Sequence, residues 1–89
     1  MSRIFELLEC ELGLEYKSFL RLLGLTDEYL QRLGEEHRKI AEVIHQALNT
    51  WLKNNKDASR EKIIDVLRSK AIARNDLANQ IEKTEKMDM

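Results

Sequence analysis

Proline is absent from this sequence, and glycine occurs only three times. These two residues supply most of the tight turns of β-hairpins, so their scarcity argues against a fold built from hairpins. Leu, Ile, Ala, Glu, Lys and Arg are abundant instead, and that composition favours helices. At 89 residues the chain has room for one domain with a single core. The sequence therefore predicts an all-α fold.

Cysteine is nearly absent too, because Cys10 is the only one. A lone cysteine forms no internal disulfide, which is typical of a reducing compartment. No apolar run reaches the roughly 18–20 residues of a membrane span. Glutamates interrupt the first residues, MSRIFELLE, where a secretion signal would be apolar. We expect a soluble, cytoplasmic domain without membrane insertion.

The residue patterns of catalytic and metal sites are also missing. His37 and His45 do not form a His-x-x-x-His pair, and no Cys-x-x-Cys or Glu-x-x-His spacing offers a metal site. No glycine-rich loop follows a strand to hold nucleotide phosphates. Cys10 is interpreted as an inert thiol and His45 as a partly exposed surface side chain. We predict that the chain is not an enzyme and takes no cofactor, metal or small-molecule substrate.

The net charge is only −1, but the two signs of charge are unevenly distributed along the chain. Residues 1–36 carry 8 acidic against 4 basic side chains (net −4), and residues 37–89 carry 11 basic against 8 acidic ones (net +3). Such a dipolar surface suits head-to-tail contact between like domains, or docking to a complementary protein. Chance, combined with a need for solubility, is the alternative explanation.

The most strongly amphipathic stretch covers residues 40–52. Its apolar side chains recur at helical spacing on one face, flanked by Ala41, Val43 and Leu52. The residues of this face are Ile40, Ile44, Ala47, Leu48 and Trp51. Burying the only tryptophan removes roughly 150–250 Å² from water. This segment therefore predicts the central helix of a bundle.

Five further helices are predicted around this segment from their apolar spacing and their end signals. Gly13 is expected in the left-handed conformation after the first helix, Gly24 is expected to stop the second, and Gly34 to close the third. N-caps are expected as follows: Thr26 for the third helix, Ser59 for the fifth and Asn75 for the sixth. The predicted buried side chains of these helices are Ile4, Phe5, Leu8, Leu12, Tyr16, Phe19, Leu20, Leu23, Leu30, Leu33, Ile63, Ile64, Leu67, Ala71, Leu77, Ala78 and Ile81.

The last residues of the chain, 84–89, are polar and show no helical periodicity. Chain ends of this kind commonly fray. The sequence therefore predicts a domain over residues 1–84 and a frayed tail over residues 85–89.

The segment LGLEYKSFLRLLGLTDEYLQRL resembles the second and third helices of a death domain. In that family an aromatic residue, here Tyr16, opens the second helix, and two apolar residues follow at the spacing of Phe19 and Leu23. A Gly-apolar-Ser/Thr turn comes next, here Gly24-Leu25-Thr26. Tryptophan is more usual than tyrosine at the first of these positions.

The resemblance continues through the second half of the chain and covers Ile4 to Glu82. A WL pair at Trp51 precedes a short polar loop to Ala58-Ser59, and the RNDLANQIE run resembles the last helix of the family. The loop before the fourth helix is short and lacks proline, which leaves the subfamily open. The resemblance implies a six-helix antiparallel bundle with death-domain-like Greek-key topology.

The resemblance also implies a function. Death domains bind one another homotypically, as self- or hetero-oligomers, and assemble receptors, adaptors and kinases in apoptotic, innate-immune and inflammatory signalling. In family terms they stack through three asymmetric contacts. Carried onto this chain, the resemblance implies a first contact that sets Lys17, Arg21, Asp27 and Glu28 against Glu6, Glu9 and Glu42. The second sets Lys53, Lys56 and Asp57 against Arg74 and Asp76. The third sets Glu28, Gln31 and Arg32 against Glu15, Glu35 and Arg38.

A helix-turn-helix DNA-binding domain is an alternative for the segment SFLRLLGLTDEYLQRLGE. Its recognition helix would begin at Thr26 and place its first residues in the major groove. Asp27 and Glu28 would then oppose the phosphate field, and Arg32 alone does not offset two carboxylates. We therefore expect no nucleic-acid partner. A passive structural bundle within a larger protein is the third possibility.

Overall fold

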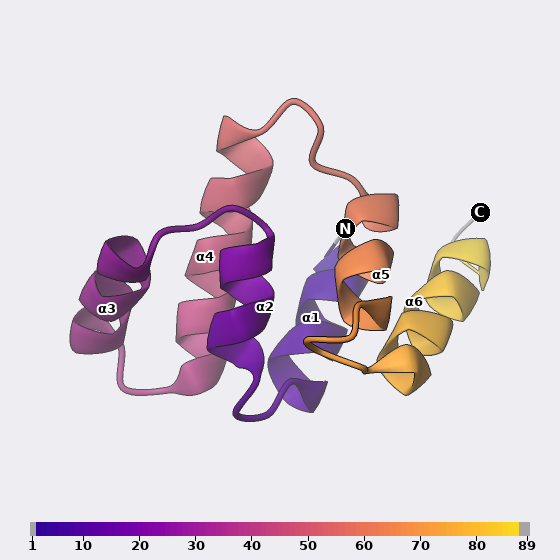
Figure 1. The fold of residues 1–89 in the computed structure, drawn as a ribbon, viewed down its shortest axis with the longest axis horizontal. Helices are drawn as coiled ribbons and strands as arrows, with labels where there is room; N and C mark the ends of the chain where they lie inside the picture. Colours follow the sequence, from indigo (N-terminus) through magenta and orange to yellow (C-terminus); the bar gives the residue numbers. More distant parts are fainter. Residues whose placement is uncertain (1, 88–89) are drawn as a thin grey trace.

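The structure, a computed structural model, describes residues 2–87 and the side chains of residues 3–83. The helices of this part are α1 (Ser2–Glu11), α2 (Tyr16–Leu22), α3 (Asp27–Glu36), α4 (Ile40–Asn54), α5 (Arg60–Arg68) and α6 (Asn75–Met87) (Figure 1). No strand occurs among the described residues. The all-α, six-helix prediction is confirmed.

Helix α4 is the centre of the packing, since α1, α2 and α3 all pack against it. Helix α5 packs against α6 and α2, and α6 also packs against α1. In Figure 1, α3 lies beside α4 at one end of the molecule, and α6 lies beside α5 at the other end. This arrangement follows from the wide apolar face of α4, which several neighbours are needed to cover.

The core is apolar throughout, and no polar or charged side chain is buried among the described residues. Trp51 is only 2% exposed, and Ile44 and Leu48 are fully buried beside it on α4. Most side chains that the sequence predicted to be buried are buried, and they include the twelve that follow. These residues are Phe5, Leu8, Phe19, Leu23, Leu30, Ile44, Leu48, Trp51, Ile63, Leu67, Leu77 and Ile81.

Two positions predicted to be buried are exposed instead. Ile40 is 44% exposed because it is the first residue of α4, and the apolar face of the helix is no longer covered at that end. Ala71 is exposed because α5 ends at Arg68, so the helical register assumed for this alanine does not hold. The chain turns there and buries Ile72. The sequence also missed Val66, which is buried on α5.

Of the three glycines, only Gly24 ends a helix in the predicted manner. Gly24 follows α2 with a φ of +108°, a conformation that side chains disfavour. Gly13 does not adopt a positive φ; its N–H instead donates to Glu15 Oε1 at 3.1 Å. Gly34 does not end α3, which continues to Glu36. Packing of Leu33 on the core outweighs the cost of a glycine within the helix, about 1 kcal/mol.

Two predicted N-caps are present. Thr26 Oγ1 accepts a hydrogen bond from the Tyr29 N–H, and Ser59 Oγ accepts one from the Lys62 N–H, both at 3.2 Å. Asn75, the third predicted cap, is instead the first residue of α6. The three predicted cap positions thus gave the first residues of α3, α5 and α6 to within one residue.

Helix α6 continues to Met87 and therefore includes residues 85–87 of the predicted frayed tail. Residues 88 and 89 lie outside the described residues. The division of the chain at residue 84 stays a prediction. None of the described helices combines the length and the apolar character needed to cross a membrane.

Candidate interaction surfaces

The turn between α2 and α3 brings charges of both signs to one edge of the molecule. Lys17 and Arg21 on α2, and Asp27 and Glu28 in the first turn of α3, are all exposed. Across the turn, Arg21 Nε lies 3.5 Å from Asp27 Oδ1. The two carboxylates interact favourably with the helix N-terminus. They also place negative charge where a DNA-recognition helix would meet phosphates, which disfavours that alternative.

The outer face of α3 carries a shallow depression of about 330 Å³. It is lined by Glu28, Gln31, Arg32 and Glu35, which share one face because they lie three or four residues apart. The sequence assigned the first three to one side of a contact and Glu35 to the opposite side. The structure places all four on the same surface.

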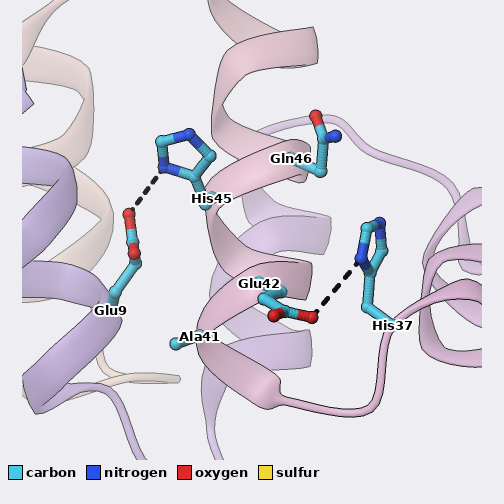
Figure 2. Close-up of a pocket in the computed structure, with 6 residues that line it drawn as sticks. All are labelled: Glu9, His37, Ala41, Glu42, His45 and Gln46. Carbon is cyan, nitrogen blue, oxygen red and sulfur yellow. Dashed lines mark hydrogen bonds and ion pairs between the residues drawn. The ribbon is translucent and has the colours of Figure 1, made fainter.

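A larger groove of about 490 Å³ lies where α1 and α4 pack, and Figure 2 shows its lining. Glu9 comes from α1, His37 from the α3–α4 connection, and Ala41, Glu42, His45 and Gln46 from α4. His45 Nδ1 lies 2.8 Å from Glu9 Oε2, and His37 Nδ1 lies 3.6 Å from Glu42 Oε2. The groove thus combines two carboxylates with the only two histidines of the chain.

The groove differs in two ways from the acidic surface predicted from the sequence. Glu9 and Glu42 lie together as expected, but Glu6 lies with Arg3 and Cys10 in a separate depression on α1. The sequence also missed the histidines. Helical spacing places His45 three residues after Glu42 on α4, but nothing in the sequence places it opposite a carboxylate 36 residues earlier.

The end of α4 and the loop after it carry the basic residues predicted for the second contact. Lys53, Lys56 and Asp57 are exposed there. Asp57 also lines a depression of about 240 Å³, whose apolar wall includes Trp51 and Ala58. This part of the surface therefore offers charge beside a small recess with a partly apolar lining.

Arg74, predicted for the same contact, makes several bonds within the molecule. Its Nη1 donates to Glu15 Oε1 at 2.6 Å and to the backbone oxygen of Glu11 at 3.1 Å. Its Nε donates to Asp76 Oδ1 at 3.2 Å. The Arg74 side chain is only 24% exposed, whereas Asp76 is well exposed. Arg74 thus joins the start of α6 to the end of α1.

Hydrogen bonds in this region also lower the pKa values of two carboxylates, Glu15 and Asp76. The hydrogen bond from the Gly13 N–H holds the pKa of Glu15 below its ordinary value of 4.5, and Arg74 adds to this effect. The hydrogen bond from Arg74 lowers the pKa of Asp76 in the same way. Both carboxylates are therefore held in the charged form to lower pH than usual.

Groups suited to metal binding are not assembled in the part of the chain that the structure describes. No three His, Cys, Asp or Glu side chains meet there in an arrangement that could hold an ion. Cys10 is exposed on α1.

Comparison with known protein families gives a match that covers nearly the whole chain. The family described as Death domain matches residues 1–85, a range that includes α1 to α5 and most of α6. No curated protein and no solved structure matches the chain.

Proposed function

The chain belongs to the death-domain family, and on this premise we propose that it is an adaptor or assembly unit in apoptotic or innate-immune and inflammatory signalling. Members of this family are homotypic protein-interaction modules and are generally not enzymes. The proposed partners are other death domains, including further copies of this chain. The proposed location is the cytoplasm.

One observation supports asymmetric charged contacts in particular. Cationic and anionic surfaces lie on different elements: Lys53 and Lys56 are exposed at the end of α4 and in the loop after it, while Asp27 and Glu28 are exposed in the first turn of α3. A molecule with two complementary and distinct surfaces can bind the next copy head to tail, and each bound copy presents a free surface again. Charge complementarity of this kind also selects among partners.

The first turn of α3 provides the test. Asp27→Lys with Glu28→Lys reverses two exposed charges and should weaken assembly about tenfold or more, because attraction becomes repulsion at a specific contact. Glu61→Lys with Asp65→Lys is a matched control, since both residues are exposed on α5 and the net charge changes equally. Sedimentation at increasing concentration, alone and with candidate death domains, measures assembly.

The parent should assemble in a concentration-dependent manner, alone or in a mixture, and the control should behave like the parent. A parent that remains monomeric alone and in every mixture would contradict the proposed function. If the folded α3 variant assembles like the parent, α3 is not part of the interface. That last result would leave the family assignment unchanged.

A further inference from the structure

Helix α3 is attached to the bundle mainly through one neighbour. Each of the other described helices packs against two or more helices, whereas α3 packs extensively against α4 alone. Figure 1 shows α3 beside α4 at one end of the molecule. On α3 itself, Leu30 and Leu33 are buried, and Tyr29 is half-buried against the core. Separating α3 from α4 would therefore break one interface and leave the contacts among the other helices in place.

The turn that precedes α3 is anchored to α2. The Leu25 N–H donates to the backbone oxygen of Leu20 at 3.2 Å, and the Leu25 side chain packs against the core. Thr26 then caps the helix by accepting from the Tyr29 N–H. These bonds hold the first end of α3 close to the bundle.

The last turn of α3 is less well supported. Residues 34–36 and 38–40 are all exposed, so this end of the helix and its connection to α4 have little cover. Glu35 and Glu36 place negative charge at the helix C-terminus, where it opposes the helix dipole. Gly34 further disfavours the helical conformation. An opening of α3 is therefore expected to start at its C-terminal end.

A hydrogen bond between side chains holds α3 against α4. Tyr29 Oη donates to Thr50 Oγ1 on α4 at 2.6 Å, in a partly buried position. The net contribution of one such bond is modest, because water satisfies both hydroxyls when they separate. The bond therefore favours the docked position of α3 without making it permanent.

We propose that α3 undocks from α4 and unfolds as a local unit while the other helices stay folded, and that the Tyr29–Thr50 hydrogen bond controls how often this happens. Native proteins open locally at elements with few buried contacts, at a lower free energy than global unfolding requires. Asp27 and Glu28 keep their positions relative to α4 only in the docked state, so a partner that contacts them binds and stabilises that state. The inference goes beyond the proposed function and does not depend on it.

Amide hydrogen exchange of the whole chain tests this proposal. Mass spectrometry follows the exchange of each helix, at a concentration at which sedimentation shows a monomer. In the parent, α3 should exchange about tenfold or more faster than residues 44–51 of α4 after correction for intrinsic rates. Low urea concentrations should accelerate residues 44–51 more than α3, because a local opening exposes less surface than global unfolding. Equal protection of the two segments with equal urea dependence would overturn the proposal.

Two substitutions on α3 should change its exchange in opposite directions. Tyr29→Phe removes the hydroxyl that donates to Thr50 and should accelerate exchange of α3 about threefold to tenfold. Gly34→Ala should slow it about threefold, because alanine favours the helix and the added Cβ enters open space. If neither substitution alters the exchange of α3, the proposal is wrong.

Ile81→Val is the control in another part of the bundle. Ile81 is fully buried on α6, which lies at the opposite end of the molecule from α3 (Figure 1). Loss of one methylene should lower global stability and accelerate residues 44–51 about twofold to tenfold, while α3 keeps its rate. Equal acceleration of both segments would show that α3 opens only when the whole domain unfolds, which would overturn the proposal. None of these results depends on assembly, so the proposed function is tested separately.

Discussion

Arg74 Nη1 lies 2.6 Å from Glu15 Oε1, although 59 residues separate these two side chains in the sequence. The pair connects the turn between α1 and α2 to the start of α6. Its two side chains are 24% and 28% exposed, so solvent screens their attraction less than that of a fully exposed pair. Arg74 therefore has a structural role in addition to the interface role that the sequence predicted.

Replacing Arg74 should destabilise the fold. Arg74→Gln removes the donors to Glu15 and to the Glu11 backbone, and we expect a loss of about 1–2 kcal/mol in the free energy of unfolding. In a domain of this size each kcal/mol lowers Tm by about 4–8 °C. Arg74→Lys keeps the positive charge but lacks the forked donors of the guanidinium group. Its free energy of unfolding should therefore lie between those of the parent and of Arg74→Gln. Thermal unfolding of the three proteins gives the comparison, and equal Tm values would show that the bonds contribute nothing.

The Glu15 carboxylate should make stability depend on pH in the acidic range. Its folded-state pKa is below the ordinary 4.5, so it stabilises the fold fully at higher pH. That contribution is lost as pH falls through the folded-state pKa. Glu15→Gln should therefore be less stable than the parent at pH 7, and the difference should shrink steadily below about pH 4.5. Urea unfolding of both proteins at pH 7, 5, 4 and 3 measures the difference. A constant difference would contradict the assigned shift.

Trp51 should be the most costly side chain to remove. Trp51→Ala should cost about 3–5 kcal/mol, a large part of the stability expected of a small domain. Leu52→Ala is the control from the next position, because Leu52 is 37% exposed and should cost much less. Circular dichroism during heating separates the two variants. A cooperative transition of the Trp51 variant within a few degrees of the parent would be incompatible with the 2% exposure of that ring.

A charge swap should identify which surfaces meet in the assembly. Lys53→Glu with Lys56→Glu should weaken assembly, and the same is expected of the α3 variant Asp27→Lys with Glu28→Lys. If these surfaces face each other, mixing the two variants should restore assembly between them. Raising the salt concentration should weaken assembly of the parent and reduce the difference in assembly between the parent and either variant, because screening reduces attraction and repulsion alike. Sedimentation of the mixture measures whether assembly is restored. If it is not restored, these two surfaces do not face each other in the assembly.

The sequence alone determined the helices and most of the core of this protein. Periodicity identified the buried stripe from Ile44 to Trp51 on α4, because a helix repeats its faces every 3.6 residues wherever it packs. The caps at Thr26 and Ser59 were also visible, because a side-chain acceptor bonds to an N–H only three residues away. The errors fell at helix ends, such as Gly34 and Ala71, where packing decides whether a weak signal ends the helix.

Only the tertiary structure decided which charges meet. Glu9 and His45 are 36 residues apart, and they pair because α1 packs on α4 at one particular rotation and offset. Arg74 likewise contacts the end of α1 because α6 packs beside it. A local sequence pattern indicates which face of a helix is buried, but not the translation or rotation of that helix relative to its neighbour. The fold could therefore be predicted from periodicity, whereas the paired charges of the α1–α4 groove required the packed bundle.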